Sequence, residues 1–246
     1  MVYEHTTMIF STDSGIVAID SPVKLKILEL LRKGTMTFEN LVEESEKAKS
    51  TISVHLDDLE RLSLIREKTF PNDKRKKYFV LNSTCFACSE IPLLDLYQKQ
   101  LDNIVISSTN GDSFIKHIYN TVRYGMEAHG FDPNPILKKL GNDIGTKIGP
   151  EFKSDDYEGI LNELTVFWKI HKLGNMTIIY KSEPEILVLD CYHCGKMSNV
   201  GKTLCSMDEG ILEGIFLSRL NIELIVREIE CYGTGHHHCR FVMEEK

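Results

Sequence analysis

The chain has 246 residues, of which 42% are hydrophobic and 26% are charged, enough for two ordinary domains that each bury a core. It contains no apolar run of the roughly 18 to 20 residues that a membrane span needs, and its first residues lack the basic and apolar segments of an export signal. We therefore expect a cytoplasmic protein. The formal net charge of −7 excludes a uniformly basic nucleic-acid-binding protein.

The charge is distributed unevenly along the chain. Residues 1–82 hold 13 basic and 13 acidic side chains, so residues 83–246 carry the whole net charge of −7. Residues 61–77 alone contain seven basic side chains against two acidic ones. Such a local basic patch can contact phosphate groups while the rest of the molecule stays acidic.

Three short helices are predicted between residues 20 and 62. Ser21 and Pro22 are typical of an N-cap and a first helical position, and Gly34 ends the helix that follows. Thr37 can cap a second short helix. A third helix runs from about Ser50 and carries an apolar face at helical spacing. This face consists of Ile52, Leu56, Leu59 and Leu62.

Two strand-like runs follow these helices, at residues 64–70 and 74–81, and the turn Pro71-Asn72-Asp73 separates them. This pattern predicts a β-hairpin with a basic second strand. Three helices closed by such a hairpin are typical of a winged helix-turn-helix, whose third helix enters the major groove. We therefore interpret residues 1–82 as a DNA-binding domain. A winged module that binds protein instead is the alternative.

Residues 50–65 resemble the recognition helix of the ArsR-like winged helix family. The resemblance implies that Thr51, Ser53 and His55 contact base edges. It also implies that phosphates are contacted by Lys49, Lys74, Arg75, Lys76 and Lys77, and cations at such positions supply affinity without sequence information. Ser63 stands where the family commonly has glycine, which suggests a less tight turn into the wing. The cysteine pair by which many relatives sense metals on this helix is absent.

Residues 83–110 are interpreted as a connector. Leu94, Tyr97, Leu101 and Ile104 recur at spacings of three and four, which predicts a helix with an apolar seam. Pairing of this seam with a second copy would give a homodimer and an operator with two-fold symmetry. Packing of the seam onto the chain's own sensor domain is the alternative.

Cys85 and Cys88 lie just ahead of the predicted connector helix. A C-x2-C motif at a helix N-terminus lowers the thiol pKa and suits disulfide chemistry or half of a metal site. Two small buried cysteines in a hinge are the alternative interpretation.

Residues 111–246 predict an α+β sensor domain. Helices are expected at 114–128, 134–148 and 208–220, and strands at 164–170, 176–180, 186–191, 223–231 and 239–243. The resulting fold class is α+β: a winged helix-turn-helix, a connecting helix and a C-terminal α+β domain.

The cysteine spacing near the C-terminus is informative. Cys231 and Cys239 bracket a predicted hairpin loop, which brings them together, and Cys205 and Glu228 complete a set that Zn²⁺ accepts. This arrangement resembles the zinc site of the vinyl-4-reductase domain family, over residues 115–244. Cys191, His193 or Cys194 could replace members of this set, and His236 to His238 could contribute.

An ArsR-like winged helix joined to a vinyl-4-reductase-type domain is similar to the MsvR-like family of methanogen-specific, redox-responsive regulators of archaea. The resemblance implies DNA binding in the reduced state and a change when sensor cysteines oxidise. Cys191 and Cys194 are then the leading candidates for a reversible disulfide. A repressor acting as a homodimer, with Zn²⁺ as its cofactor, is the expected function.

Two other functions remain open at this point. The same architecture could sense a small hydrophobic or aromatic ligand in a pocket lined by Phe114, Tyr119, Phe131, Phe167, Trp168 and Phe216, although plain core packing is the simpler use of such residues. An acidic protein-binding adaptor is the other. We predict no enzyme, because the sequence has neither a glycine-rich nucleotide loop nor an assignable catalytic triad.

Overall fold

The computed structural model describes residues 7–70, 73–102, 111–180, 184–195, 197 and 199–246. The chain divides into two compact units, each with a hydrophobic core of its own. Unit 1 comprises Met1–Pro92 and His129–Pro133, and unit 2 comprises Leu93–Ala128 and Asn134–Lys246. None of the described helices is both long enough and apolar enough to cross a membrane.

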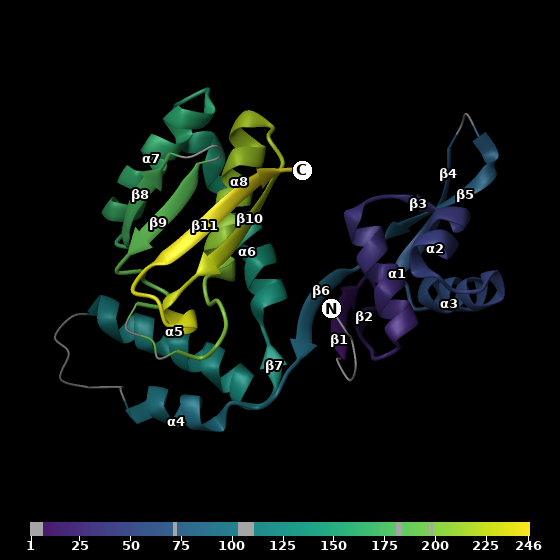
Figure 1. Cartoon of the computed structure of the whole chain (residues 1–246), viewed down its shortest axis with the longest axis horizontal. Helices are drawn as coiled ribbons and strands as arrows, with labels where there is room; N and C mark the ends of the chain where they lie inside the picture. Colours follow the sequence, from purple (N-terminus) through teal and green to yellow (C-terminus); the bar gives the residue numbers. More distant parts are fainter. Residues whose placement is uncertain (1–6, 71–72, 103–110, 181–183, 196, 198) are drawn as a thin grey trace. The chain divides into compact units, whose positions relative to one another are not determined.

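The described part of unit 1 has three helices and two small antiparallel sheets (Figure 1). Its helices are α1 (Pro22–Lys33), α2 (Phe38–Ser45) and α3 (Lys49–Arg61). One sheet has the order β3 (Met36–Thr37), β5 (Asp73–Leu81) and β4 (Ile65–Phe70). The other has the order β2 (Gly15–Ile19), β1 (Met8–Thr12), β6 (Thr84–Ser89) and β7 (Phe131–Asp132).

The helices of unit 1 begin where the sequence predicts, because their caps are local. The Ser21 hydroxyl accepts the Lys24 N–H, and Thr37 and Asn40 form a reciprocal capping box at the start of α2. The apolar face of α3 packs into the core of unit 1, where Ile52, Leu56 and Leu59 are buried and Leu62 is partly buried. The three-helix core and basic hairpin of a winged helix are therefore both present.

The turn from α3 into the wing is tight, contrary to the expectation from Ser63. This serine itself adopts a left-handed conformation with φ of 59°. The Leu64 N–H donates to the Leu59 carbonyl at 3.0 Å, and the Ser63 N–H donates to the Glu60 carbonyl at 2.9 Å. This is the hydrogen-bond pattern of a Schellman cap, formed here without glycine.

Strand β6 corrects the interpretation of Cys85 and Cys88. Both cysteines lie within this strand, which pairs with β1, and the next helix begins only at Leu94. No helix N-terminus therefore acts on their thiols. Residues 8–19, for which no structure was predicted, form the β1–β2 hairpin that gives β6 its partner.

Unit 2 has five α-helices and a four-stranded antiparallel sheet in its described part (Figure 1). The helices are α4 (Leu94–Asp102), α5 (Gly111–Ala128), α6 (Asn134–Ile148), α7 (Tyr157–Ile170) and α8 (Ser206–Leu220). The sheet order is β10 (Leu224–Glu230), β11 (Cys239–Glu245), β9 (Glu185–Leu189) and β8 (Asn175–Ile179). Short 3-10 helices occur at Gly149–Glu151 and Tyr232–Thr234. The predicted α+β class is confirmed.

The strand predicted at residues 164–170 is wrong, because this segment is the second half of α7. The Asp156 carboxylate caps the helix by accepting the Gly159 N–H at 2.8 Å. Ile160, Leu164 and Trp168 then follow at helical spacing and are all buried. The local run of β-branched and aromatic residues favours a strand, but the cap and the buried face prevail.

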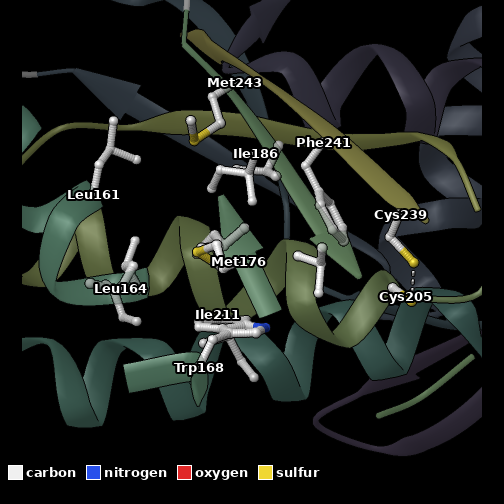
Figure 2. Packing of buried hydrophobic residues seen from close by; sticks show 14 of the residues in the cluster. Leu161, Leu164, Trp168, Met176, Ile186, Cys205, Ile211, Cys239, Phe241 and Met243 are labelled. Atoms are coloured by element: carbon white, nitrogen blue, oxygen red, sulfur yellow. Dashed lines mark hydrogen bonds between the residues drawn. The ribbon is translucent and has the colours of Figure 1, made fainter. Parts of the chain in front are cut away.

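The core of unit 2 lies between the sheet and helices α7 and α8. Figure 2 shows Leu164 and Trp168 of α7 facing Met176, Ile186 and Phe241 of the strands, with Cys205 and Cys239 at one end of the cluster. Helices α6 and α8 cross at very short range through glycines. A Cβ atom at Gly141 or Gly145 would overlap the carbonyl oxygen of Met207 or Ile211.

Helix α4 packs on α5 within unit 2. The Tyr97 ring lies beside Gly125, and the Leu93 N–H donates to the Glu127 carbonyl at 3.2 Å. Leu94 is 58% exposed, and Ile104 lies outside the described residues. Part of the predicted seam therefore contacts the chain's own sensor domain, and dimerisation through the rest stays a prediction.

Candidate metal centre and DNA-binding surface

Four cysteines from four different segments meet at one end of the unit 2 core. They are Cys194 in the turns after β9, Cys205 at the start of α8, Cys231 after β10 and Cys239 at the start of β11. Their sulfur atoms and a carboxylate oxygen of Glu228 all lie within 4.8 Å of one another. All five residues are buried.

The β10–β11 hairpin explains how Cys231 and Cys239 come together. The strands pair as far as Glu230 and Arg240. Cys231, the residue after β10, and Cys239, the first residue of β11, therefore face each other across the loop. The loop is closed by the Cys231 N–H, which donates to the Thr234 hydroxyl at 2.9 Å. Cys239 also pairs with Val188 of β9, and β9 leads directly into the turns that carry Cys194.

The distances between the sulfurs are compatible with a shared ion. The Sγ atoms of Cys194 and Cys239 are 3.0 Å apart, those of Cys194 and Cys205 3.3 Å, and those of Cys205 and Cys239 3.7 Å. A tetrahedral Zn²⁺ with Zn–S bonds of about 2.3 Å would separate its sulfurs by roughly 3.8 Å. Only a small outward movement would accommodate such an ion.

Backbone N–H groups hold the Glu228 carboxylate at the same centre. One carboxylate oxygen accepts the N–H groups of Leu204 and Cys205, both at 2.9 Å. The other, Oε1, is buried and has no hydrogen-bond partner among the described residues. Burial raises the pKa of Glu228 to about 9. An unpartnered carboxylate oxygen beside four thiols fits a cation at this place, either as a ligand or as a nearby countercharge.

Cys191 lies next to the four-thiol set. Its Sγ is 3.5 Å from that of Cys205, and hydrogen bonds from neighbouring thiols, Cys194 first, lower its pKa. His193 and Asp208 form a buried pair beside it, with Nε2 and Oδ1 3.2 Å apart. Burial opposes protonation of His193, but Asp208 outweighs it and raises the pKa of the imidazole.

The structure thus separates the candidate cysteines differently from the sequence pattern. Cys194, which the sequence groups with Cys191 as a redox pair, lies among Cys205, Cys231 and Cys239. His236 and His238 contact Glu230 instead of the thiols, and the His238 Nε2 is 2.7 Å from the Glu230 carboxylate. The sequence pattern does not reveal that Cys194 belongs to this set, because its neighbours come from segments that are distant in the sequence.

Only some of the α3 residues expected to contact DNA lie on the exposed face of the helix. Lys49 and Ser53 are exposed, whereas Thr51 and His55 are half-buried. Ser50 and Val54 share the exposed face, and Val54 is 59% exposed although it is apolar. Sequence reasoning missed Val54, whose exposed methyl groups are suited to contact with a thymine methyl group.

The wing carries cations with different surroundings. Lys76 and Lys77 are exposed, but the Lys77 ammonium lies 2.8 Å from the Glu67 carboxylate across the β4–β5 ladder. This hydrogen bond raises the pKa of Lys77. The side chains of Lys74 and Arg75 lie outside the described residues.

An apolar groove of about 500 Å³ opens on unit 2, beside α7. Its apolar lining residues are Ile148, Phe152, Val166, Phe167 and Ile170, and three polar residues, Glu151, Glu163 and His171, also line it. The aromatic residues expected to line a pocket do not gather there. Only Phe167 contributes, since Trp168 and Phe216 are buried in the core and Phe131 packs on Phe86 of unit 1.

Comparison with known families agrees with this architecture. Residues 21–67 match the family described as bacterial regulatory protein, arsR family, and residues 184–245 match the vinyl-4-reductase domain family. The chain joins an arsR-family helix-turn-helix to a vinyl-4-reductase domain. This is the combination predicted from the MsvR-like resemblance. It indicates a DNA-binding transcription regulator rather than an enzyme, with the vinyl-4-reductase domain as its sensor-like unit.

Several similar proteins come from one archaeon. Uncharacterized protein MJ0150 of Methanocaldococcus jannaschii is 27% identical over 55% of this chain and 79% of its own length. Uncharacterized protein MJ1642 of the same organism is 28% identical over 46% of this chain and 65% of its own length. A solved vinyl-4-reductase family protein of M. jannaschii is 15% identical, covers 62% of this chain and 92% of its own, and has a TM-score of 0.37.

Proposed function

We propose that this regulator is a repressor that responds to oxidation of the buried cysteines of its vinyl-4-reductase domain. The observation that carries the proposal is the meeting of five buried cysteines, four of them with a carboxylate, in the domain attached to the helix-turn-helix. Thiols are the side chains whose covalent state changes reversibly under oxidants. A sensor of this kind needs no bound ligand other than a structural ion.

The four-thiol set is proposed to hold Zn²⁺. Cys194, Cys205, Cys231 and Cys239 would be its ligands, because four thiolates make a closed structural site, and Glu228 would remain on the backbone of residues 204–205. When bound, the ion would stabilise the thiolate forms of these cysteines. The set Cys205, Glu228, Cys231 and Cys239, predicted from the sequence, is the rival.

Metal analysis of two variants separates the ligand sets. We expect Cys194→Ser to lose the bound zinc and Glu228→Gln to retain one ion per chain, with Cys85→Ser as a matched control outside the centre. Retention by Cys194→Ser together with loss by Glu228→Gln would establish the rival set. Loss in the Cys85→Ser control would place the ion elsewhere.

Cys191 is proposed to form the sensing disulfide with Cys194. Cys194 is the neighbour that lowers the pKa of Cys191 most, and Cys191 is the buried thiol left over beside the four-thiol set, 3.5 Å from the Sγ of Cys205. With hydrogen peroxide as oxidant, the two thiols lose two electrons and two protons, an S–S bond forms, and the hydrogen peroxide becomes two molecules of water. The disulfide would withdraw Cys194 from the four-thiol set.

Operator binding tests this function directly. We expect the reduced protein to shift the promoter DNA of its own gene in a gel, peroxide to abolish the shift, and dithiothreitol to restore it. Cys191→Ala or Cys194→Ala should abolish the response to peroxide. A response that persists in both alanine variants would show that this pair is not the sensor.

A homodimer is proposed as the DNA-binding form. A single arsR-type recognition helix reads only a short site, and two copies related by a two-fold axis double the contacts. The proposal predicts a dimer by light scattering. It also predicts that scrambling one half of a palindromic operator weakens binding far more than scrambling the spacer.

Sensing of a small hydrophobic ligand is a second candidate, favoured by the groove beside α7. Its lining is mostly apolar, as in sites for small aromatic molecules. Titration with phenol in the absence of oxidant tests it. Release of operator DNA by phenol, and loss of that release in Val166→Glu, would support ligand sensing over redox sensing.

A further inference from the structure

Strand β6 contains a β-bulge between its two cysteines. Cys85 pairs with Phe10 of β1, Ala87 pairs with Ile9, and Cys88 pairs with Met8. Phe86 therefore has no partner in β1, and three steps along β6 correspond to two steps along β1. The bulge is thus a single extra residue.

The bulge changes which cysteines share a face. In a regular strand, residues three apart point to opposite faces and are about 10 Å apart, too far for a disulfide. With one residue extruded, Cys85 and Cys88 stand opposite Phe10 and Met8, which share a face and lie roughly 6.6 Å apart. That separation is near the upper limit of about 6.8 Å between the Cα atoms of disulfide-bonded cysteines.

The surroundings of the two thiols shift their pKa values in opposite directions. The interaction between the two thiols lowers the pKa of Cys85 and raises that of Cys88. Burial opposes the shift of Cys85, and the nearby positive charge of Arg32 adds to it. Both side chains are partly exposed, so a small oxidant can reach them. Cys85 is therefore suited to attack and Cys88 to resolve.

We propose that Cys85 and Cys88 form a reversible disulfide within β6, a second oxidation site separate from the cysteines of the vinyl-4-reductase domain. The Cys85 thiolate attacks hydrogen peroxide, the O–O bond breaks, and Cys85 becomes a sulfenic acid, while the departing hydroxide takes up the proton that the Cys85 thiol had lost and becomes water. The Cys88 thiol then displaces water from that sulfur to form the S–S bond. Two thiols lose two electrons and two protons, and hydrogen peroxide becomes two molecules of water.

The pair lies close in sequence to the connection between the two units, and its disulfide is separate from the sensor response proposed above. β6 is the last strand of unit 1 before the chain enters unit 2 at Leu93, and its partner β1 carries the core residue Phe10. A bond at the limit of disulfide geometry is strained and hence easily reduced. Any effect of this bond on operator binding would rest on the proposed redox function, whereas formation of the bond itself does not.

One peptide reports on the pair alone. Trypsin cleaves after Lys77 and Lys99, and residues 78–99 contain Cys85 and Cys88 but no other cysteine. We expect the full chain treated with hydrogen peroxide and then alkylated under denaturing conditions to yield this peptide unalkylated and lighter by two hydrogen atoms. Dithiothreitol before alkylation should restore two alkylated cysteines.

Matched variants keep the two oxidation sites distinct. Cys191→Ala should leave the disulfide in residues 78–99 intact while losing the proposed sensor response, and Cys88→Ser should leave Cys85 open to alkylation or to sulfenic acid trapping. The inference is overturned if both thiols of this peptide stay alkylated at peroxide concentrations that oxidise Cys191. It is equally overturned if Cys85 or Cys88 links only to a cysteine of another peptide. If the disulfide forms and operator binding ignores all oxidants, the β6 site stands and the redox function fails.

Discussion

Ser63 holds a backbone conformation that a side chain makes costly. Its φ of 59° lies in the left-handed region, and it closes the turn from the recognition helix into the wing. Within the described part of the chain its hydroxyl makes no hydrogen bond, so glycine would relieve the strain without losing a contact. We expect Ser63→Gly to raise the free energy of unfolding of unit 1 by about 0.5 to 1 kcal/mol, after the entropic cost of glycine.

Urea denaturation of the wild type and two variants tests this expectation. Ser63→Ala is the matched control, because it removes the hydroxyl and keeps the Cβ that causes the strain. Equal stabilisation by Ala and Gly would show that the hydroxyl, and not the backbone conformation, sets the cost.

At the scale of elements, the sequence predicts well where the determining contacts are local. Helices α1 and α2 begin at the predicted caps Ser21 and Thr37, and the β10–β11 hairpin forms where two alternating runs flank a glycine-rich loop. The strand prediction for residues 164–170 is wrong because their β-branched and aromatic residues resemble a strand, while the Asp156 cap lies several residues upstream. Strand β6 was not predicted, because its partner β1 lies more than 70 residues away in the sequence.

The candidate metal centre likewise combines residues that local spacing predicts with one residue that it does not predict. Cys231 and Cys239 flank one hairpin, and Glu228 lies on its first strand, so spacing alone predicts that they meet. Cys194 joins them only because β9 pairs with β11 and the turns after β9 fold back. That contact depends on strand order, which a single sequence does not specify.

The crossing of α6 and α8 gives a prediction of its own. A Cβ at Gly145 would overlap the Ile211 carbonyl oxygen, and backbone cannot move aside as a flexible side chain can. The helices would have to separate, which outweighs the helix propensity that alanine gains over glycine, about 1 kcal/mol. We expect Gly145→Ala to destabilise unit 2 by roughly 3 kcal/mol.

Gly125 supplies the control for this substitution. It also lies inside a helix, α5, but a Cβ there would make only an ordinary contact with the Tyr97 ring. Gly125→Ala should therefore be neutral or stabilising by up to about 1 kcal/mol. Thermal denaturation followed by circular dichroism compares the two, and equal effects would refute the close-crossing argument.

At the scale of the whole molecule, charge is divided between a neutral DNA-binding region and an acidic remainder. The DNA-binding unit then offers few cations to phosphate groups. These cations also differ in their partners, because Lys77 already pairs with Glu67 whereas Lys76 is exposed. We expect Lys49→Ala and Lys76→Ala each to reduce the salt dependence of operator binding by about one counterion, and Lys77→Ala to reduce it less.

Operator titrations by fluorescence anisotropy at several salt concentrations measure these slopes. Lys153→Ala, an exposed site in unit 2, is the control that should leave the slope unchanged. A slope that falls equally for Lys77 and Lys76 would mean that Glu67 releases Lys77 when DNA binds.

The two units should also unfold as separate transitions, and only one of them should depend on metal. Each unit has its own core, and Cys194, Cys205, Cys231 and Cys239 belong to the core of unit 2. An ion that binds only the folded centre stabilises that unit by mass action, about 4 kcal/mol at a thousandfold excess over its Kd. For a unit of this size, its removal should lower the Tm of unit 2 by roughly 10 °C or more.

Differential scanning calorimetry with and without a strong chelator measures both transitions. Ile52→Ala, a cavity in the core of unit 1, identifies the other transition by lowering its Tm alone. Metal removal and Ile52→Ala should therefore shift different peaks. If each perturbation moves both peaks together, the two units fold cooperatively. A change at the thiol centre would then affect the recognition helix through the shared stability of the units rather than through the connecting chain.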